Sequence, residues 1–132
     1  MYAEIYPYLD DEALFMFQYG QSLSQTGKYE KSNCMLKKAA TVSCDPMIYN
    51  IIGKNYQSMG NYAEAEKYFR KAAYIVPHRL YPYYLLAKMY EEKGCEKCFN
   101  NMALFILNKE VKVDSPATRE MKEDILRMME KE

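Results

Sequence analysis

Apolar residues recur along the chain at intervals of three and four residues, the spacing that places them on one face of a helix. In the stretch GNYAEAEKYFRKAAYIVP, which runs from Gly60 to Pro77, these positions are Ala65, Phe69 and Ala72. Gly60 permits a tight turn before the helix, and Pro77 cannot continue it. The pattern therefore predicts one helix between the glycine and the proline.

A second amphipathic stretch lies near the end of the sequence, in DSPATREMKEDILRMMEKE. Ser115 is a favourable N-cap residue, and Pro116 suits the first position of a helix. One apolar stripe then contains Ala117, Met121, Ile125, Met128 and Met129. Charged residues occupy the other faces, so residues 114–132 are predicted to form a helix that caps an apolar surface and faces solvent on its other side.

The order of small, aromatic and turn residues around Gly53 occurs three times. The corresponding residues are Gly53, Tyr56 and Gly60 in the middle copy, Ala87, Tyr90 and Gly94 in the following copy, and Gly20 and Gly27 in the preceding copy. The copies lie about 34 residues apart, a period of helical repeat arrays, in which each unit buries its apolar face by stacking on a neighbour.

The middle copy resembles a tetratricopeptide repeat, on the evidence of Tyr49, Ile52, Gly53, Tyr56, Ala65, Phe69, Ala72 and Pro77. Tyr49 stands where this family usually has Trp, and Ile52 where it usually has Leu. The resemblance implies an all-α, right-handed solenoid of three helix-turn-helix repeats. Its boundaries are expected at 13–45, 46–79 and 80–113, followed by the capping helix at 114–132. Residues 1–12 resemble the end of a preceding helix, which suggests that the chain is part of a larger protein.

The repeat pattern has a steric explanation. Gly53 and Ala65 are expected where the two helices of the middle repeat cross, with Phe69 filling the space one turn further on. In the third repeat, Phe99 and Ala103 exchange large and small residues at the positions of Ala65 and Phe69, a change that roughly conserves volume.

Charge and hydropathy exclude two classes of partner. The 132 residues include 18 basic and 18 acidic side chains, so no net charge attracts nucleic acid or an anionic membrane. The longest apolar run, Met102 to Leu107, is far shorter than the roughly 20 residues of a membrane span. We expect neither nucleic-acid binding nor membrane insertion of this segment.

The tetratricopeptide resemblance implies a non-catalytic module that binds a protein or peptide in a concave groove. The groove positions on the first helix of each repeat are Phe17, Gln21, Met47, Asn50, Lys54, Tyr81, Tyr84 and Lys88. Such a surface suits a segment that carries some acidic groups. Phe17 and Gln21 replace the Lys and Asn of the family's carboxylate clamp, which argues against binding of chaperone tails. Ordinary solvated positions are the alternative interpretation.

The four cysteines leave the cellular compartment open. Cys95 and Cys98 form a CxxC motif at the start of a predicted helix, where a thiol pKa falls and a small disulfide can close, so a thiol-redox function is one alternative. The motif lacks a second pair of metal ligands, and the single histidine, His78, lies in a different turn. No metal, cofactor or catalytic group is expected.

A second resemblance is to the C-terminal repeat tail of O-antigen ligase or polymerase-like membrane proteins of Bacteroidetes. The segment VPHRLYPYYLLAKMY carries most of it. This resemblance implies a tail that faces the periplasm, tethered to a membrane protein upstream, and it allows a disulfide between Cys95 and Cys98. Without it, a cytoplasmic location is expected.

Overall fold

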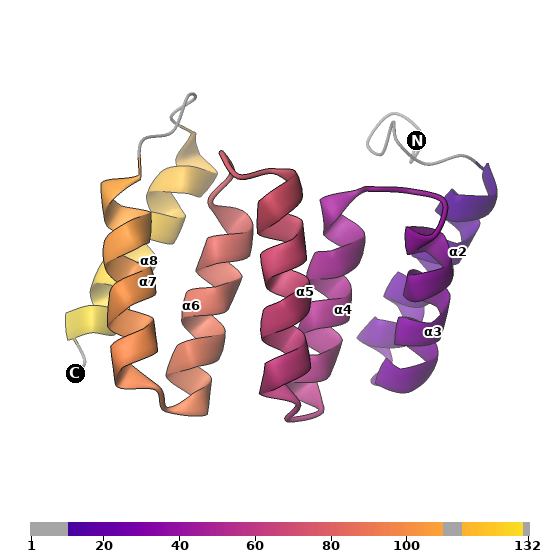
Figure 1. Cartoon of the computed structure of the whole chain (residues 1–132), viewed down its shortest axis with the longest axis horizontal. Helices are drawn as coiled ribbons and strands as arrows, with labels where there is room; N and C mark the ends of the chain where they lie inside the picture. Colours follow the sequence, from indigo (N-terminus) through magenta and orange to yellow (C-terminus); the bar gives the residue numbers. More distant parts are fainter. Residues whose placement is uncertain (1–10, 110–114, 131–132) are drawn as a thin grey trace. The chain divides into compact units, whose positions relative to one another are not determined.

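The computed structural model describes residues 11–109 and 115–130, and within these ranges the chain forms helices and no strand. The seven described helices are α2 (Asp11–Gln25), α3 (Tyr29–Ala40), α4 (Pro46–Ser58), α5 (Tyr62–Ile75), α6 (Tyr81–Lys93), α7 (Glu96–Asn108) and α8 (Pro116–Glu130) (Figure 1). They divide into two compact units, Met1–Ile75 and Val76–Glu132, which are described separately.

Unit 1 consists of two helical hairpins. Helix α2 packs on α3, α4 packs on α5, and α3 joins the hairpins by packing on α4 (Figure 1). Gly27 and Gly60 form the turns inside the hairpins with φ angles of 82° and 79°, in the left-handed region where side chains are disfavoured. Asp45 starts α4 by accepting a hydrogen bond from the Met47 N–H at 2.9 Å, with Pro46 in the first helical turn.

Each hairpin of unit 1 contains a glycine that lies against a large side chain of the neighbouring helix. A Cβ atom added to Gly53 would lie 2.5 Å from Cε1 of Phe69, and one added to Gly20 would lie 2.7 Å from Cγ of Leu36. The ring of Phe69 therefore fills the space against Gly53 itself. The sequence predicted that Phe69 would lie one turn beyond the point where the two helices approach at Gly53. That prediction is wrong, because Gly53 has no side chain to keep the ring away.

A buried hydrogen-bond network links three helices of unit 1. The Asn55 amide donates to Ser32 Oγ at 2.9 Å and to Asn33 Oδ1 at 2.8 Å, and its own Oδ1 accepts from Ser24 at 2.5 Å. Ser32 in turn donates to the Gly20 carbonyl at 2.6 Å. Because every polar group of Asn55 has a partner, its complete burial carries little net cost.

Unit 2 contains one hairpin and a third helix. Helix α6 packs on α7, and α8 contacts both. Gly94, with φ of 89°, ends α6 as a left-handed C-cap. Phe99 and Ala103 are both completely buried on α7, so the exchanged large and small residues occupy the interior of this unit.

Helix α8 begins where the sequence predicts it. Ser115 accepts a hydrogen bond from the Thr118 N–H at 3.2 Å, which makes it the N-cap. Ile125 is completely buried, and Met121, Met128 and Met129 are half-buried, whereas Ala117 is exposed. The apolar stripe therefore covers unit 2 from the second turn of the helix onward.

None of the described helices has the length and apolar content that a membrane crossing requires. The predicted segment 1–12 lies almost entirely outside the described residues; its last two positions belong to α2.

Candidate functional site

Phe17 does not belong to an exposed groove. Its side chain is completely buried in a core cluster with Ala13, Leu36, Ile48 and Ile52. Its assignment as a partner-binding residue is corrected for this reason: a large ring on α2 gains more from burial between the hairpins than from exposure to a ligand. Gln21, one turn later on the same helix, is half-buried.

The other predicted groove residues of unit 1 lie on α4. Met47 is half-buried and packs against the core cluster, Asn50 is 4% exposed, and Lys54 is exposed. The Oδ1 atom of Asn50 is buried and accepts no hydrogen bond from the residues that the structure describes. A buried acceptor without a donor is costly, so it is a feature that asks for a functional explanation.

The predicted groove residues of unit 2 lie on α6, and one of them, Tyr84, contacts α8. The Tyr84 hydroxyl donates a hydrogen bond to Oδ2 of Asp124 on α8, and Lys88 Nζ lies 5.3 Å from the centroid of the Tyr84 ring. Burial, reinforced by this hydrogen bond, raises the pKa of Tyr84 to about 12. The same bond, with Arg127 nearby, lowers the pKa of Asp124. Tyr81 is half-buried and Lys88 exposed.

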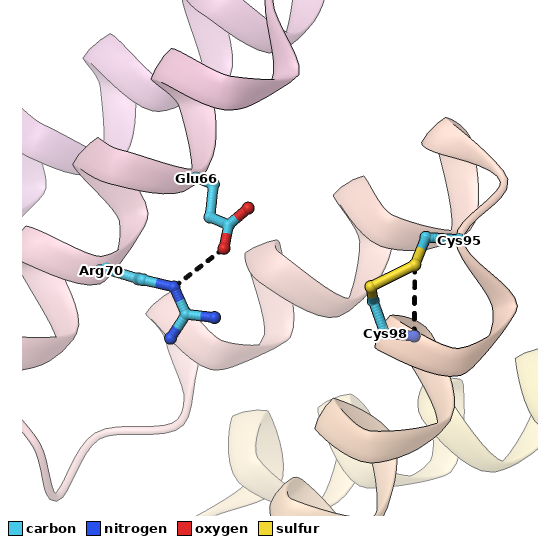
Figure 2. The surroundings of a disulfide bond; sticks show 4 residues. All are labelled: Glu66, Arg70, Cys95 and Cys98. Carbon is cyan, nitrogen blue, oxygen red and sulfur yellow. Dashed lines mark hydrogen bonds and ion pairs between the residues drawn. A yellow bond between two sulfur atoms is a disulfide. The ribbon is translucent and has the colours of Figure 1, made fainter.

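The structure joins Cys95 and Cys98 by a disulfide, with their Cα atoms 5.3 Å apart (Figure 2). Cys95 is the N-cap of α7, and its sulfur accepts a hydrogen bond from the Cys98 N–H at 3.4 Å. Cys34 and Cys44 are exposed thiols. His78 is exposed, and across residues 11–109 and 115–130 no three His, Cys, Asp or Glu side chains gather closely enough to hold a metal ion.

Sequence reasoning missed a stack of three tyrosines in unit 1, which we call the tyrosine ladder. Tyr49 and Tyr56 on α4 flank Tyr68 on α5, with ring centroids 6.1 and 5.7 Å from that of Tyr68 and interplanar angles of 26° and 19°. The repeat signature explained Tyr49 and Tyr56 individually as packing residues. Their spacing of two helical turns was the signal that a third ring fits between them.

Three lysines lie beside the ladder, and one of them, Lys67 on α5, has its Nζ atom 5.7 Å from the Tyr68 centroid. Lys37 Nζ on α3 is 5.2 Å from the Tyr56 centroid and 5.7 Å from that of Tyr68, and it donates a hydrogen bond to the Tyr56 hydroxyl at 2.6 Å. This bond raises the pKa of Lys37. Lys71 Nζ on α5 is 4.9 Å from the Tyr68 centroid and 5.8 Å from that of Tyr49. The ammonium groups of Lys37 and Lys71 thus each lie beside the junction of two adjacent rings.

Comparison with known proteins identifies the fold. A family model of the tetratricopeptide repeat matches residues 48–78. The structure is similar to the crystal structure of the Sgt2 TPR domain from Aspergillus fumigatus, with a TM-score of 0.72 and 15% sequence identity over 92% of this chain and 82% of that domain. No curated protein matches the chain.

The chain therefore contains a tetratricopeptide repeat at residues 48–78 and has the fold of a TPR domain. The prediction of an all-α tetratricopeptide solenoid is confirmed. The matched segment begins two residues inside α4 and ends three residues beyond α5, so it covers the hairpin that carries Asn50, Lys54 and the tyrosine ladder.

Proposed function

We propose that this protein is a non-catalytic interaction module that binds a peptide segment of a partner protein along the α4 face formed by Met47, Asn50 and Lys54. These residues follow one another by about one turn of the helix and so share a face. Half-buried Gln21 on α2 adds an amide from the first hairpin.

The observation that carries the proposal is the buried Oδ1 atom of Asn50, for which the described part of the chain supplies no donor. An extended peptide presents backbone N–H groups along its length, and one of them can supply the missing hydrogen bond. The unbranched thioether of Met47, about one turn away, can change rotamer to admit the peptide.

Lys54 determines the kind of segment that fits this face. Its ammonium group is exposed at the end of the α4 face and favours a carboxylate on the bound chain through a charge-assisted hydrogen bond. We therefore expect an extended peptide whose backbone meets Asn50 and whose acidic side chain meets Lys54.

Two asparagines of α4 provide a matched experiment. Asn50→Leu removes an acceptor that lacks a partner, so the free energy of unfolding should stay the same or rise, whereas peptide binding should fall about tenfold. Asn55→Leu removes an amide whose donors and acceptor are all bonded, so it should destabilise the protein. Peptides selected from a phage-displayed library on the wild-type chain serve as probes, with affinity measured by calorimetry and stability by urea denaturation.

A library that yields peptides whose affinity survives both Asn50→Leu and Lys54→Glu would contradict the proposed α4 face. The same conclusion follows if Asn50→Leu destabilises the protein as much as Asn55→Leu, because Asn50 would then be a structural residue with a partner of its own.

A second candidate function is that of a periplasm-facing tail of a glycan-assembly membrane protein. The observation that favours it is the disulfide between Cys95 and Cys98, because disulfides persist in oxidising compartments. Alkylation of thiols in intact cells should then modify Cys34 and Cys44 and spare the CxxC pair. Modification of all four cysteines would remove the support for this location and leave a dithiol with possible redox activity to be assayed.

A further inference from the structure

The ladder, together with Lys37 and Lys71 beside it, forms a surface distinct from the α4 face used above. The rings of Tyr49 and Tyr56 are held in place by stacking on Tyr68, and Lys37 and Lys71 are both exposed. Within the described residues, neither lysine pairs with a carboxylate, although two acidic side chains of α5 lie nearby in other ion pairs. An ammonium group has three donors, and Lys37 uses one of them on the Tyr56 hydroxyl, so both cations retain donors for a ligand.

An apolar cleft adjoins the ladder. It has a volume of about 400 Å³ and is lined by Tyr49, Lys67, Arg70, Lys71, Tyr74 and Ile75, all of which belong to unit 1. Tyr74 is 88% exposed and Ile75 is 38% exposed, an unusual amount of apolar surface next to three cations. Lys67 pairs with Glu64 of the same helix. Arg70 pairs with Glu66 at 3.1 Å (Figure 2).

We propose that this surface binds an acidic, extended peptide segment of a partner protein, with carboxylates on Lys37 and Lys71 and an apolar side chain in the cleft beside Tyr74. Both ammonium groups lie close to one ring, 5.7 and 4.9 Å from the Tyr68 centroid. Acidic residues at alternate positions of an extended chain point to the same side, so one chain can present a carboxylate to each of these two cations.

The combination of charge and apolar surface selects this occupant. The two lysines complement carboxylates, but Tyr74 and Ile75 offer nothing to an inorganic phosphate, which is polar on every side. Tyr68, the central ring of the ladder, is stacked by the other two rings and is only 8% exposed, so it is closed to stacking by a sugar or a nucleobase. A peptide supplies both required parts, because two carboxylates and an apolar side chain at alternate positions of an extended chain all point to the same side.

The test uses a synthetic peptide in which Glu, Glu and Leu occupy alternate positions, so that all three side chains point to one side of the extended chain, and a counterpart with Gln for Glu. Calorimetry should show binding of the Glu peptide, about tenfold weaker binding for Lys37→Glu and for Lys71→Glu, and no measurable binding of the Gln peptide. Lys71→Met keeps the aliphatic stem and should also weaken binding. Lys31→Glu is the matched control, since it makes the same charge change at an exposed site of α3 outside the ladder, and it should change affinity less than twofold.

Tyr56→Phe tests how the surface is organised. It keeps the stacked ring but removes the hydroxyl that holds Lys37, so it should lower the affinity by a few fold while circular dichroism stays unchanged. A loss of this kind separates a positioned lysine from one that contributes charge alone.

Three outcomes would overturn the proposal. If Lys31→Glu weakens binding as much as Lys71→Glu, the peptide responds only to overall charge. If Asn50→Leu abolishes binding while both ladder lysines are dispensable, the peptide occupies the α4 face instead. If an oligogalacturonate binds in a manner that depends on Lys71 and the Glu peptide does not bind, the surface recognises an acidic glycan rather than a peptide.

Discussion

Units 1 and 2 place large and small side chains differently at equivalent positions of the repeat. In unit 1, α5 has Ala65 followed one turn later by Phe69, whose ring lies against Gly53. In unit 2, α7 has Phe99 followed by Ala103, and both of these are completely buried, as are Ala65 and Phe69. The same helical hairpin thus tolerates either order, because an interior requires that its volume be filled and not that a given residue fill it.

The two units also differ in the polarity of their interiors. Asn55 on α4 is the centre of a buried hydrogen-bond network, whereas the equivalent position on α6 holds Met89, which is equally buried. The network depends on polar side chains of the hairpin that precedes α4 in unit 1, namely Ser24, Ser32 and Asn33. Buried polarity in this fold is therefore a property of a local set of side chains and is not required by the repeat itself.

Exchanging the large and small residues of α5 is the strongest test of the first difference. Phe69→Ala should lower the free energy of unfolding by about 3–5 kcal/mol, because it leaves a cavity against Gly53. Adding Ala65→Phe gives α5 the order found in α7 and should recover part of that loss. Urea denaturation followed by circular dichroism measures both variants.

The control for this exchange is Ala65→Phe alone, which adds a ring to a filled interior and should itself be destabilising by about 1–3 kcal/mol. If the two changes simply add, with no favourable coupling, the order of side chains is fixed by more than volume, and the comparison with unit 2 fails.

Giving unit 1 the apolar residue of unit 2 tests the second difference. Asn55→Met removes the partners of Ser24, Ser32 and Asn33, so it should lower the free energy of unfolding by about 1–3 kcal/mol. Replacing Asn33 with Ala in the same chain removes the acceptor that Asn55→Met leaves without its donor and should reduce the loss. An Asn55→Met protein as stable as wild type would show that the network contributes nothing.

The sequence predicted the architecture well and the individual contacts less well, for a physical reason. Small residues, turn glycines and caps act locally, so Gly60 and Ser115 could be identified from their neighbours alone. Burial depends on what lies across the interface. Phe17 occupies a repeat position that can face a groove, but its burial is decided by Leu36 and Ile48, which are distant in sequence.

The same limit explains what was missed at the candidate sites. The ladder needs Tyr68 to enter between two rings of another helix, and Lys37 to reach it from a third. Asn50 could be assigned to the α4 face, but its missing donor could not be foreseen, because satisfaction of a buried polar atom is a property of its surroundings.

The smallest expected effect concerns the hydrogen bond between Tyr84 of α6 and Asp124 of α8 in unit 2. Tyr84→Phe removes the hydrogen bond to Asp124 and should cost about 1 kcal/mol near neutral pH.

The pH dependence of this cost identifies the bond. The pKa of Tyr84 is raised from 10.0 to about 12, so its contribution is complete below pH 10 and is lost as the pH rises toward 12. The pKa of Asp124 is lowered from 3.8, so its contribution is present above that pH and is lost as the pH falls below it. The difference in unfolding free energy between wild type and Tyr84→Phe should therefore be greatest in the intervening range and shrink at both ends. A difference that does not vary with pH would mean that the phenylalanine variant lost packing alone, and that α8 is held on α6 by apolar contacts such as those of Ile125.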